Sequence, residues 1–104
     1  MMMNENAKFL IGEAVRALTV GEDDVKRRLW AAYLRHLMFV SEEHIPADFR
    51  PLLASIHTRL TRTPRYKGQS TVESALFGMH KRTAAKITVD IFELYLGVAH
   101  RPNG

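Results

Sequence analysis

Apolar residues recur at helical spacing through most of this chain, and the clearest run lies near its carboxyl end. Over residues 70–98 they follow one another every three or four positions, which places them along one side of a helix. The members of this stripe are Val72, Leu76, Met79, Thr83, Ile87, Ile91, Leu94 and Val98. We therefore predict a single long helix from Ser70 to Val98, around which the rest of the chain is organised.

Both ends of the predicted long helix carry residues typical of helix termini. Residues 70–73 read Ser-Thr-Val-Glu, the form of a capping box, in which the serine hydroxyl accepts from the glutamate N–H and the glutamate carboxylate reaches back. Gly97 stands where a left-handed terminating residue is expected. Gly78 is the weak point, because a glycine inside a helix costs about 1 kcal/mol relative to alanine.

Three shorter amphipathic segments precede the predicted long helix. The first covers residues 5–19, and the second covers residues 22–38. The third starts at Asp48, whose side chain suits an N-cap, and has Pro51 in its first turn, where a missing N–H costs nothing. A following proline places the end of this third helix near residue 62.

Four amphipathic helices with short connections, and no segment with the alternating pattern of a strand, predict an all-α fold. The expected architecture is an antiparallel four-helix bundle with a long C-terminal helix. A chain of 104 residues has the length of one domain. We expect a single helical domain over residues 1–104, with frayed tails at 1–5 and 99–104.

The four predicted helices differ in length. At 1.5 Å per residue the last would span about 40 Å and the others about 22–25 Å, so part of its apolar stripe would extend past its neighbours. Ile91, Phe92, Leu94, Tyr95 and Val98 are too apolar to remain in water as one patch. Two interpretations stay open: a second copy of the chain covers this end, or the first helix or the N-terminal tail does. We expect the former, a homodimer.

Composition excludes several classes of protein. The chain has no cysteine, so it forms no disulfide, no thiolate metal site and no cysteine nucleophile, which fits a reducing compartment. Its N-terminus has no basic region followed by a long apolar run, so we expect no signal peptide. The apolar clusters are short and bounded by charge, so we expect no membrane span and a cytoplasmic location.

Charge is unevenly distributed along the chain. Residues 1–48 hold six Lys and Arg against eight Asp and Glu, a net charge of −2. Residues 49–104 hold nine Lys and Arg against three Asp and Glu, a net charge of +6, which makes the whole chain +4. Such an asymmetry bears on binding partners and on encounter rates, and it says nothing about the fold.

The positive charge is concentrated around the start of the predicted long helix. We define the basic face by eight residues, namely Arg62, Arg65, Tyr66, Lys67, Ser70, Lys81, Arg82 and Lys86. Its expected role is contact with an acidic protein partner. The alternative is a nucleic acid, held by phosphate contacts through the same face, with Tyr66 available to stack on a base.

Part of the basic face has the composition of an anion site. Residues 67–71 combine a lysine, a glycine, two hydroxyl side chains and free backbone N–H groups at a helix N-terminus, which suits a phosphate. Glu73 argues against this, because in the capping role it places a negative charge where the anion would sit. The segment also lacks the full pattern of a phosphate-binding loop.

A helix-turn-helix is a natural alternative for a small basic helical protein. Ala17 and Gly21 are spaced as in the turn of such motifs. The second helix would then open with the acidic residues 22–24, where phosphate and base contacts belong, and Arg27 would occupy an apolar position. Both features argue against this motif.

Neither the histidines nor the serines form a recognisable catalytic or metal-binding pattern. The chain contains no H-E-x-x-H and no Glu-x-x-His pair. His57 and His80 border apolar stripes, and we expect them to be half-buried and hydrogen-bonded. The serines lie in caps or helices, without the strand-turn-helix elbow of a nucleophile. We therefore expect no catalytic residue, no metal and no cofactor, and interpret the chain as a non-enzymatic interaction or adaptor protein.

Overall fold

The computed structural model describes residues 5–20, 24–61, 68 and 70–100, and within them the chain is helical with no strand. Its α-helices are α1 (Glu5–Val20), α2 (Val25–Arg35), α3 (Arg50–Arg59), α4 (Thr71–Phe77) and α5 (Lys81–Ala99). Three 3-10 helices, η1 (Leu37–Phe39), η2 (Glu42–His44) and η3 (Ala47–Phe49), connect α2 to α3. The predicted all-α class is confirmed. No helix of this described part has the length and apolarity needed to cross a membrane.

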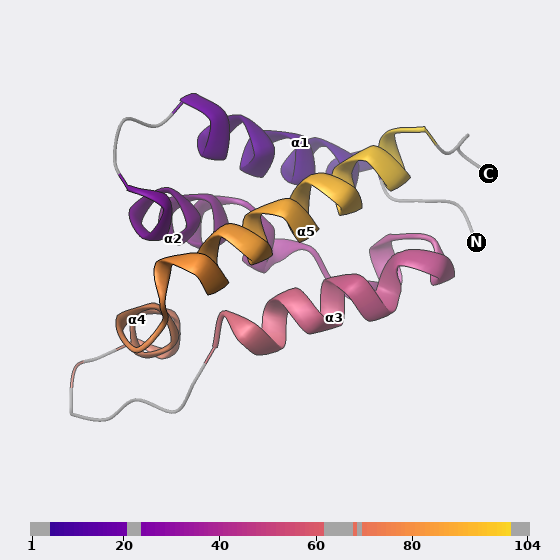
Figure 1. The fold of residues 1–104 in the computed structure, drawn as a ribbon. Coiled ribbons are helices and arrows are strands. Elements are labelled where there is room, and N and C mark those ends of the chain that lie inside the picture. Colours follow the sequence, from indigo (N-terminus) through magenta and orange to yellow (C-terminus); the bar gives the residue numbers. More distant parts are fainter. Residues whose placement is uncertain (1–4, 21–23, 62–67, 69, 101–104) are drawn as a thin grey trace.

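Helix α5 is the element that the others pack against. It contacts α1, α2 and α3, and it is the longest helix of the described residues. Figure 1 shows it crossing the front of the molecule, with α1 and α2 on one side and α3 on the other. It runs opposite in direction to both α1 and α3, and α4 lies crosswise at the end where α5 begins.

The predicted uninterrupted helix from Ser70 to Val98 is wrong. The helix stops at Phe77, Gly78 is the C-cap of α4, and a new helix starts at Lys81 with His80 as its N-cap. Gly78 is the residue that a continuous helix would accommodate least well, because glycine loses the most backbone entropy in a helix interior. The chain breaks at that point.

The break allows α4 to close one end of the helical assembly. In α4, Val72, Ala75 and Leu76 are buried, and the helix contacts α2. A straight continuation of α5 would carry these side chains past the shorter helices, as the length mismatch in the sequence implied. With the break, α5 spans about 28 Å, and the first two turns of the predicted helix fold back over the core.

The apolar patch expected at the C-terminal end of α5 is not exposed. Ile91, Leu94 and Val98 are completely buried, while Phe92 and Tyr95 are half-buried and pack against the same core. Helix α1 contacts α5, and Gly12 of α1 lies beside the Tyr95 ring at this end. The expectation that a second copy of the chain covers these side chains is therefore wrong, because the first helix of the same chain covers them.

The shorter helices begin and end close to the predicted positions. Helix α1 agrees with the predicted segment 5–19, and Pro51 lies in the first turn of α3 as expected. Helix α2 is shorter than predicted at both ends: Asp24 caps its start by accepting the Arg27 N–H at 3.0 Å, and the helix ends at Arg35, before the 3-10 helix η1. Asp48 is not the N-cap of α3, since it lies within η3 and Phe49 takes that position.

Gly97 has a different role from the predicted one. It lies inside α5, and Gly68 is the one described glycine with a positive φ. A Cβ atom added at Gly97 would overlap the ring of Phe49. The absence of a side chain at position 97 therefore lets the segment before α3 approach α5 closely.

The substitution Gly97→Ala is expected to lower the free energy of unfolding. Alanine would gain about 1 kcal/mol in helix propensity, but displacing the Phe49 ring costs about 1–3 kcal/mol as overpacking. Urea unfolding of the two proteins checks this. In a Phe49→Ala background, Gly97→Ala should be neutral or stabilising, because the ring that the new methyl group would displace is absent. If Gly97→Ala alone is more stable than the parent, the proposed close packing of Gly97 against Phe49 is contradicted.

Candidate functional site

The structure describes four of the eight residues of the basic face. Ser70, Lys81, Arg82 and Lys86 are all exposed. The remaining members lie outside the described residues; they are Arg62, Arg65, Tyr66 and Lys67. The three cations that are described occupy the first two turns of α5.

Ser70 does not share a helix with these cations. It caps α4, where its hydroxyl accepts the Glu73 N–H at 3.0 Å, which is half of the predicted capping box. Helix α4 has only seven residues, so it offers little of the dipole that an anion site at its start would use. The structure therefore gives no support to a phosphate site at this helix start.

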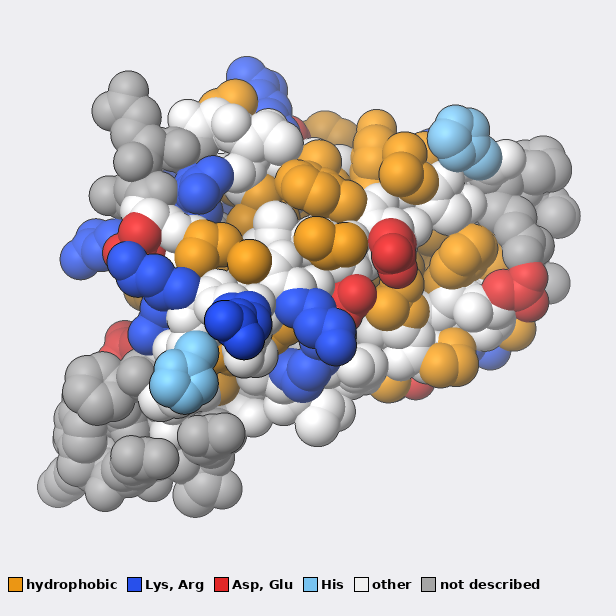
Figure 2. Space-filling model, in the orientation of Figure 1, with side chains coloured by type: hydrophobic (Ala, Val, Ile, Leu, Met, Phe, Trp, Pro, Cys, Tyr) orange, Lys and Arg blue, Asp and Glu red, His pale blue; other side chains and the backbone are white. Residues whose placement is uncertain are grey.

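Basic side chains from two helices meet where α5 begins. Figure 2 shows Lys and Arg side chains gathered over the end of the molecule where α2 and α5 start. Asp24 lies among them. The pKa of the Asp24 carboxyl is lowered, mainly by the hydrogen bond from the Arg27 N–H. Desolvation acts in the opposite direction and raises this pKa. The positive charges of Lys81 and Lys26 lower it further. The start of α2 is thus within electrostatic reach of the start of α5.

Within the described ranges the ion pairs involve other residues. Arg59 Nη2 lies 2.5 Å from Asp90 Oδ2 and links α3 to α5, and His44 Nε2 lies 4.0 Å from Glu43 Oε1. Lys81, Arg82 and Lys86 take part in neither pair. The exposed cations at the start of α5 thus differ from Arg59 on the adjacent helix, which is neutralised by Asp90.

A polar contact inside the molecule joins α2 to α3. The Tyr33 hydroxyl lies 2.6 Å from His57 Nδ1, and His57 Nε2 lies 2.8 Å from the Val40 carbonyl oxygen. Because a carbonyl only accepts, Nε2 carries the proton, and Nδ1 accepts from the Tyr33 hydroxyl. Burial raises the pKa of Tyr33, so its hydroxyl stays a donor. His57 is half-buried and hydrogen-bonded as expected, while His80 is exposed.

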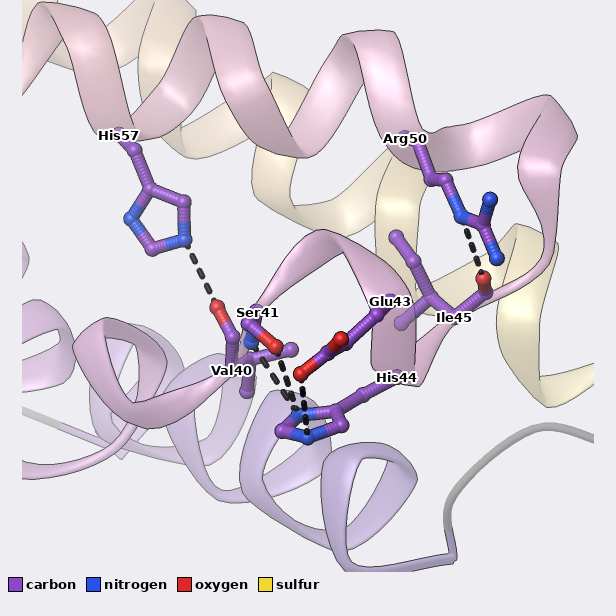
Figure 3. Close-up of polar contacts among 7 residues, drawn as sticks. All are labelled: Val40, Ser41, Glu43, His44, Ile45, Arg50 and His57. Carbon is purple, nitrogen blue, oxygen red and sulfur yellow. Dashed lines mark hydrogen bonds and ion pairs between the residues drawn. The ribbon is translucent and has the colours of Figure 1, made fainter.

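The remaining polar groups of the connection between α2 and α3 hold its backbone in place. Figure 3 shows His57 against the Val40 carbonyl and Arg50 against the Ile45 carbonyl, the latter at 3.1 Å. The His44 ring turns back onto Ser41, with Nδ1 3.3 Å from the serine N and 3.2 Å from its Oγ. These side chains are thus engaged with the backbone or with near neighbours. Over the described residues no group of three His, Asp or Glu side chains is placed to hold a metal ion.

The partners of His57 cannot be predicted from the local sequence. Tyr33 and Val40 lie 24 and 17 residues away from it in the chain, so no local pattern connects them. The one available indication was a histidine beside an apolar stripe. The network stabilises the fold, and nothing in its geometry indicates chemistry.

The substitution Tyr33→Phe is expected to lower the free energy of unfolding by about 1–3 kcal/mol, because His57 Nδ1 would be left without a donor. Chemical denaturation measures this difference. Tyr95→Phe is the matched control, since it removes a hydroxyl from a half-buried tyrosine of α5, and we expect a change within about 0.5 kcal/mol. Equal effects of the two substitutions would contradict the role of the hydrogen bond.

Asp24 is expected to contribute to the acid sensitivity of the fold. Its pKa is lowered in the folded protein, so its contribution to stability is present above about pH 4 and is lost as the pH falls through the folded value. The Asp24→Asn variant keeps an oxygen for the cap and cannot titrate. Its urea midpoint should fall less than that of the parent between neutral pH and about pH 3, and an identical acid response would contradict this role.

Known proteins offer no significant match to this chain. No family model matches it, no curated protein matches it, and no solved structure matches it. The function proposed below therefore depends on the geometry and charges of the chain itself.

Proposed function

We propose that this chain is a small, non-enzymatic, cytoplasmic interaction or adaptor protein that binds an acidic protein partner through its basic face. Its architecture in this proposal is an antiparallel four-helix bundle of α1, α2, α3 and α5, with α4 across one end. In Figure 1, α1 runs opposite to both α2 and α5, and α3 runs opposite to α5, whereas α2 and α5 run in the same direction, as the diagonal helices of such a bundle do. The absence of cysteine is compatible with a reducing compartment.

The observation that carries the proposal is the position of the cations on α5. Lys81 and Arg82 are the first two residues of the helix, Lys86 follows one turn later, and the first turn contains no acidic residue. The N-terminus of a helix is the positive end of its dipole, so cations there are unfavourable for the helix itself. Their placement is not explained by stability, and it suits a surface that meets a negative partner.

A nucleic acid is the second candidate partner for the same face. Exposed Lys and Arg side chains bind phosphates without regard to sequence, and such binding weakens steeply as salt is added. Asp24, which interacts with Lys81, makes this surface less uniformly positive than nucleic-acid-binding surfaces usually are. For this reason the acidic protein remains the preferred partner.

Replacing two of the cations tests the proposal. The double variant Lys81→Gln with Arg82→Gln should bind poly-L-glutamate about 2- to 30-fold more weakly in fluorescence anisotropy, since each exposed charge pair is worth about 0.2–1 kcal/mol. The control variant, Arg16→Gln with Arg35→Gln, removes the same charge from exposed positions on α1 and α2. If the control loses as much affinity for poly-L-glutamate, binding depends on net charge alone, and a specific role of the basic face is contradicted.

A mobility-shift assay with duplex DNA at two salt concentrations separates the candidates. Binding to DNA at low salt, with no binding to poly-L-glutamate, would favour the nucleic-acid alternative. Absence of binding to both probes would overturn the proposed role of the basic face.

We also propose that the protein is a homodimer. The expected interface at Ile91, Leu94 and Val98 is excluded by their burial, so a dimer needs a different surface.

A further inference from the structure

Helix α5 carries a second apolar stripe on the side that faces away from the core. Ala85, Val89 and Leu96 are exposed, the latter two at 52% and 54%, and Phe92 is half-buried. Their spacing of four, three and four residues places them in one row about 17 Å long. Figure 2 shows hydrophobic side chains in a band along α5 on this face of the molecule.

This outer stripe is distinct from the buried one. The core side of α5 is occupied by Ala84, Ile87, Ile91, Leu94 and Val98. Single exposed apolar residues are normal on a protein surface, but a row with the alternating three- and four-residue spacing of a coiled-coil seam is the pattern by which one helix packs along another. No element of the described chain covers Val89 or Leu96.

We propose that the outer stripe is the interface of a homodimer in which the α5 helices of two copies pack antiparallel. A two-fold axis would pass between Val89 and Phe92, so that Val89 faces the partner's Phe92. Ala85 would then face the partner's Leu96. Each layer pairs a small side chain with a large one, which keeps the distance between the two helices uniform along the row.

Charges beside the stripe specify the direction of the second helix. Lys86 follows Ala85 and Glu93 follows Phe92, so both lie along the same edge of the row, and both are exposed. In the antiparallel register Lys86 approaches the partner's Glu93, and the symmetry repeats this pair. In a parallel pair this edge would face the opposite edge of the partner's helix, so Lys86 and Glu93 would not meet and the two charge pairs would be lost. The surface is thus complementary to itself, which is why we assign a second copy as its occupant.

The dimer does not depend on the acidic partner proposed above. Lys86 of the basic face would be engaged by the partner's Glu93, whereas Lys81 and Arg82 lie at the outer end of the row, beyond the four apolar positions. In the antiparallel pair these cations from the two copies would be at opposite ends of the interface. A test of the apolar positions therefore leaves the first residues of the basic face unchanged.

Analytical ultracentrifugation over a concentration series tests the interface. The parent should form a dimer at micromolar concentration, and Val89→Glu with Leu96→Glu should weaken the dimer by about tenfold or more. Phe39→Glu is the matched control, because Phe39 is 61% exposed on η1 and lies outside the stripe. Circular dichroism verifies that each variant is folded. A parent that stays monomeric at high micromolar concentration would overturn the proposal, as would a dimer that the double substitution leaves intact.

A charge swap tests the register. Lys86→Glu alone and Glu93→Lys alone should each weaken the dimer by about 2- to 5-fold, because each replaces two attractive pairs with two repulsive ones. The combined variant restores opposite charges at both pairs and should recover the dimer. Failure of the combined variant to exceed either single variant would contradict the antiparallel pairing.

Introduced cysteines report the orientation without interference, because the chain has none of its own. Under oxidation, a mixture of the Ala85→Cys and Leu96→Cys proteins should form a disulfide-linked heterodimer. Neither variant alone should cross-link efficiently, since identical positions would lie about 16 Å apart along the axis. Efficient self-linking of each variant would indicate a parallel pair and overturn the proposed geometry.

Discussion

The burial of the apolar residues between Val72 and Val98 is the constraint on which the rest of the structure depends. These side chains need partners on all of α1, α2 and α3, but those helices are too short to line one straight helix of that length. The chain meets the constraint by breaking after Phe77. One part then lies along the neighbouring helices as α5, and the other part folds over their end as α4.

Helical periodicity was sufficient to predict the class, the first helix and the inner side of α5, because each depends on local spacing. The break at Gly78 could not be derived in this way. Leu76, Met79 and Thr83 keep helical spacing across it, so the pattern is the same whether or not the backbone hydrogen bonds continue. Gly97 was misinterpreted for a related reason, since its role is set by the ring of Phe49, which is distant in the chain.

The candidate surfaces were predictable to different degrees. The excess of cations in the second half of the chain is a property of composition, and the exposure of Lys81, Arg82 and Lys86 agrees with it. These cations are separated from Ser70 because the helix breaks between them, and the break cannot be predicted from the distribution of charge along the sequence. The outer row on α5 is also present in the sequence, but its member Phe92 lies between Ile91 and Leu94, which are buried. Two stripes on one helix can be told apart only when it is known which side the neighbours cover.

The separation of α4 from α5 has a consequence for local opening of the fold. A helix of seven residues has too few internal hydrogen bonds to persist in water by itself, so α4 depends on the packing of Val72 and Leu76. Amide protons of this segment should therefore exchange with solvent through sub-global opening, well before those in the middle of α5. The end of the molecule next to the basic side chains is thus expected to open at a lower free-energy cost than the middle of α5.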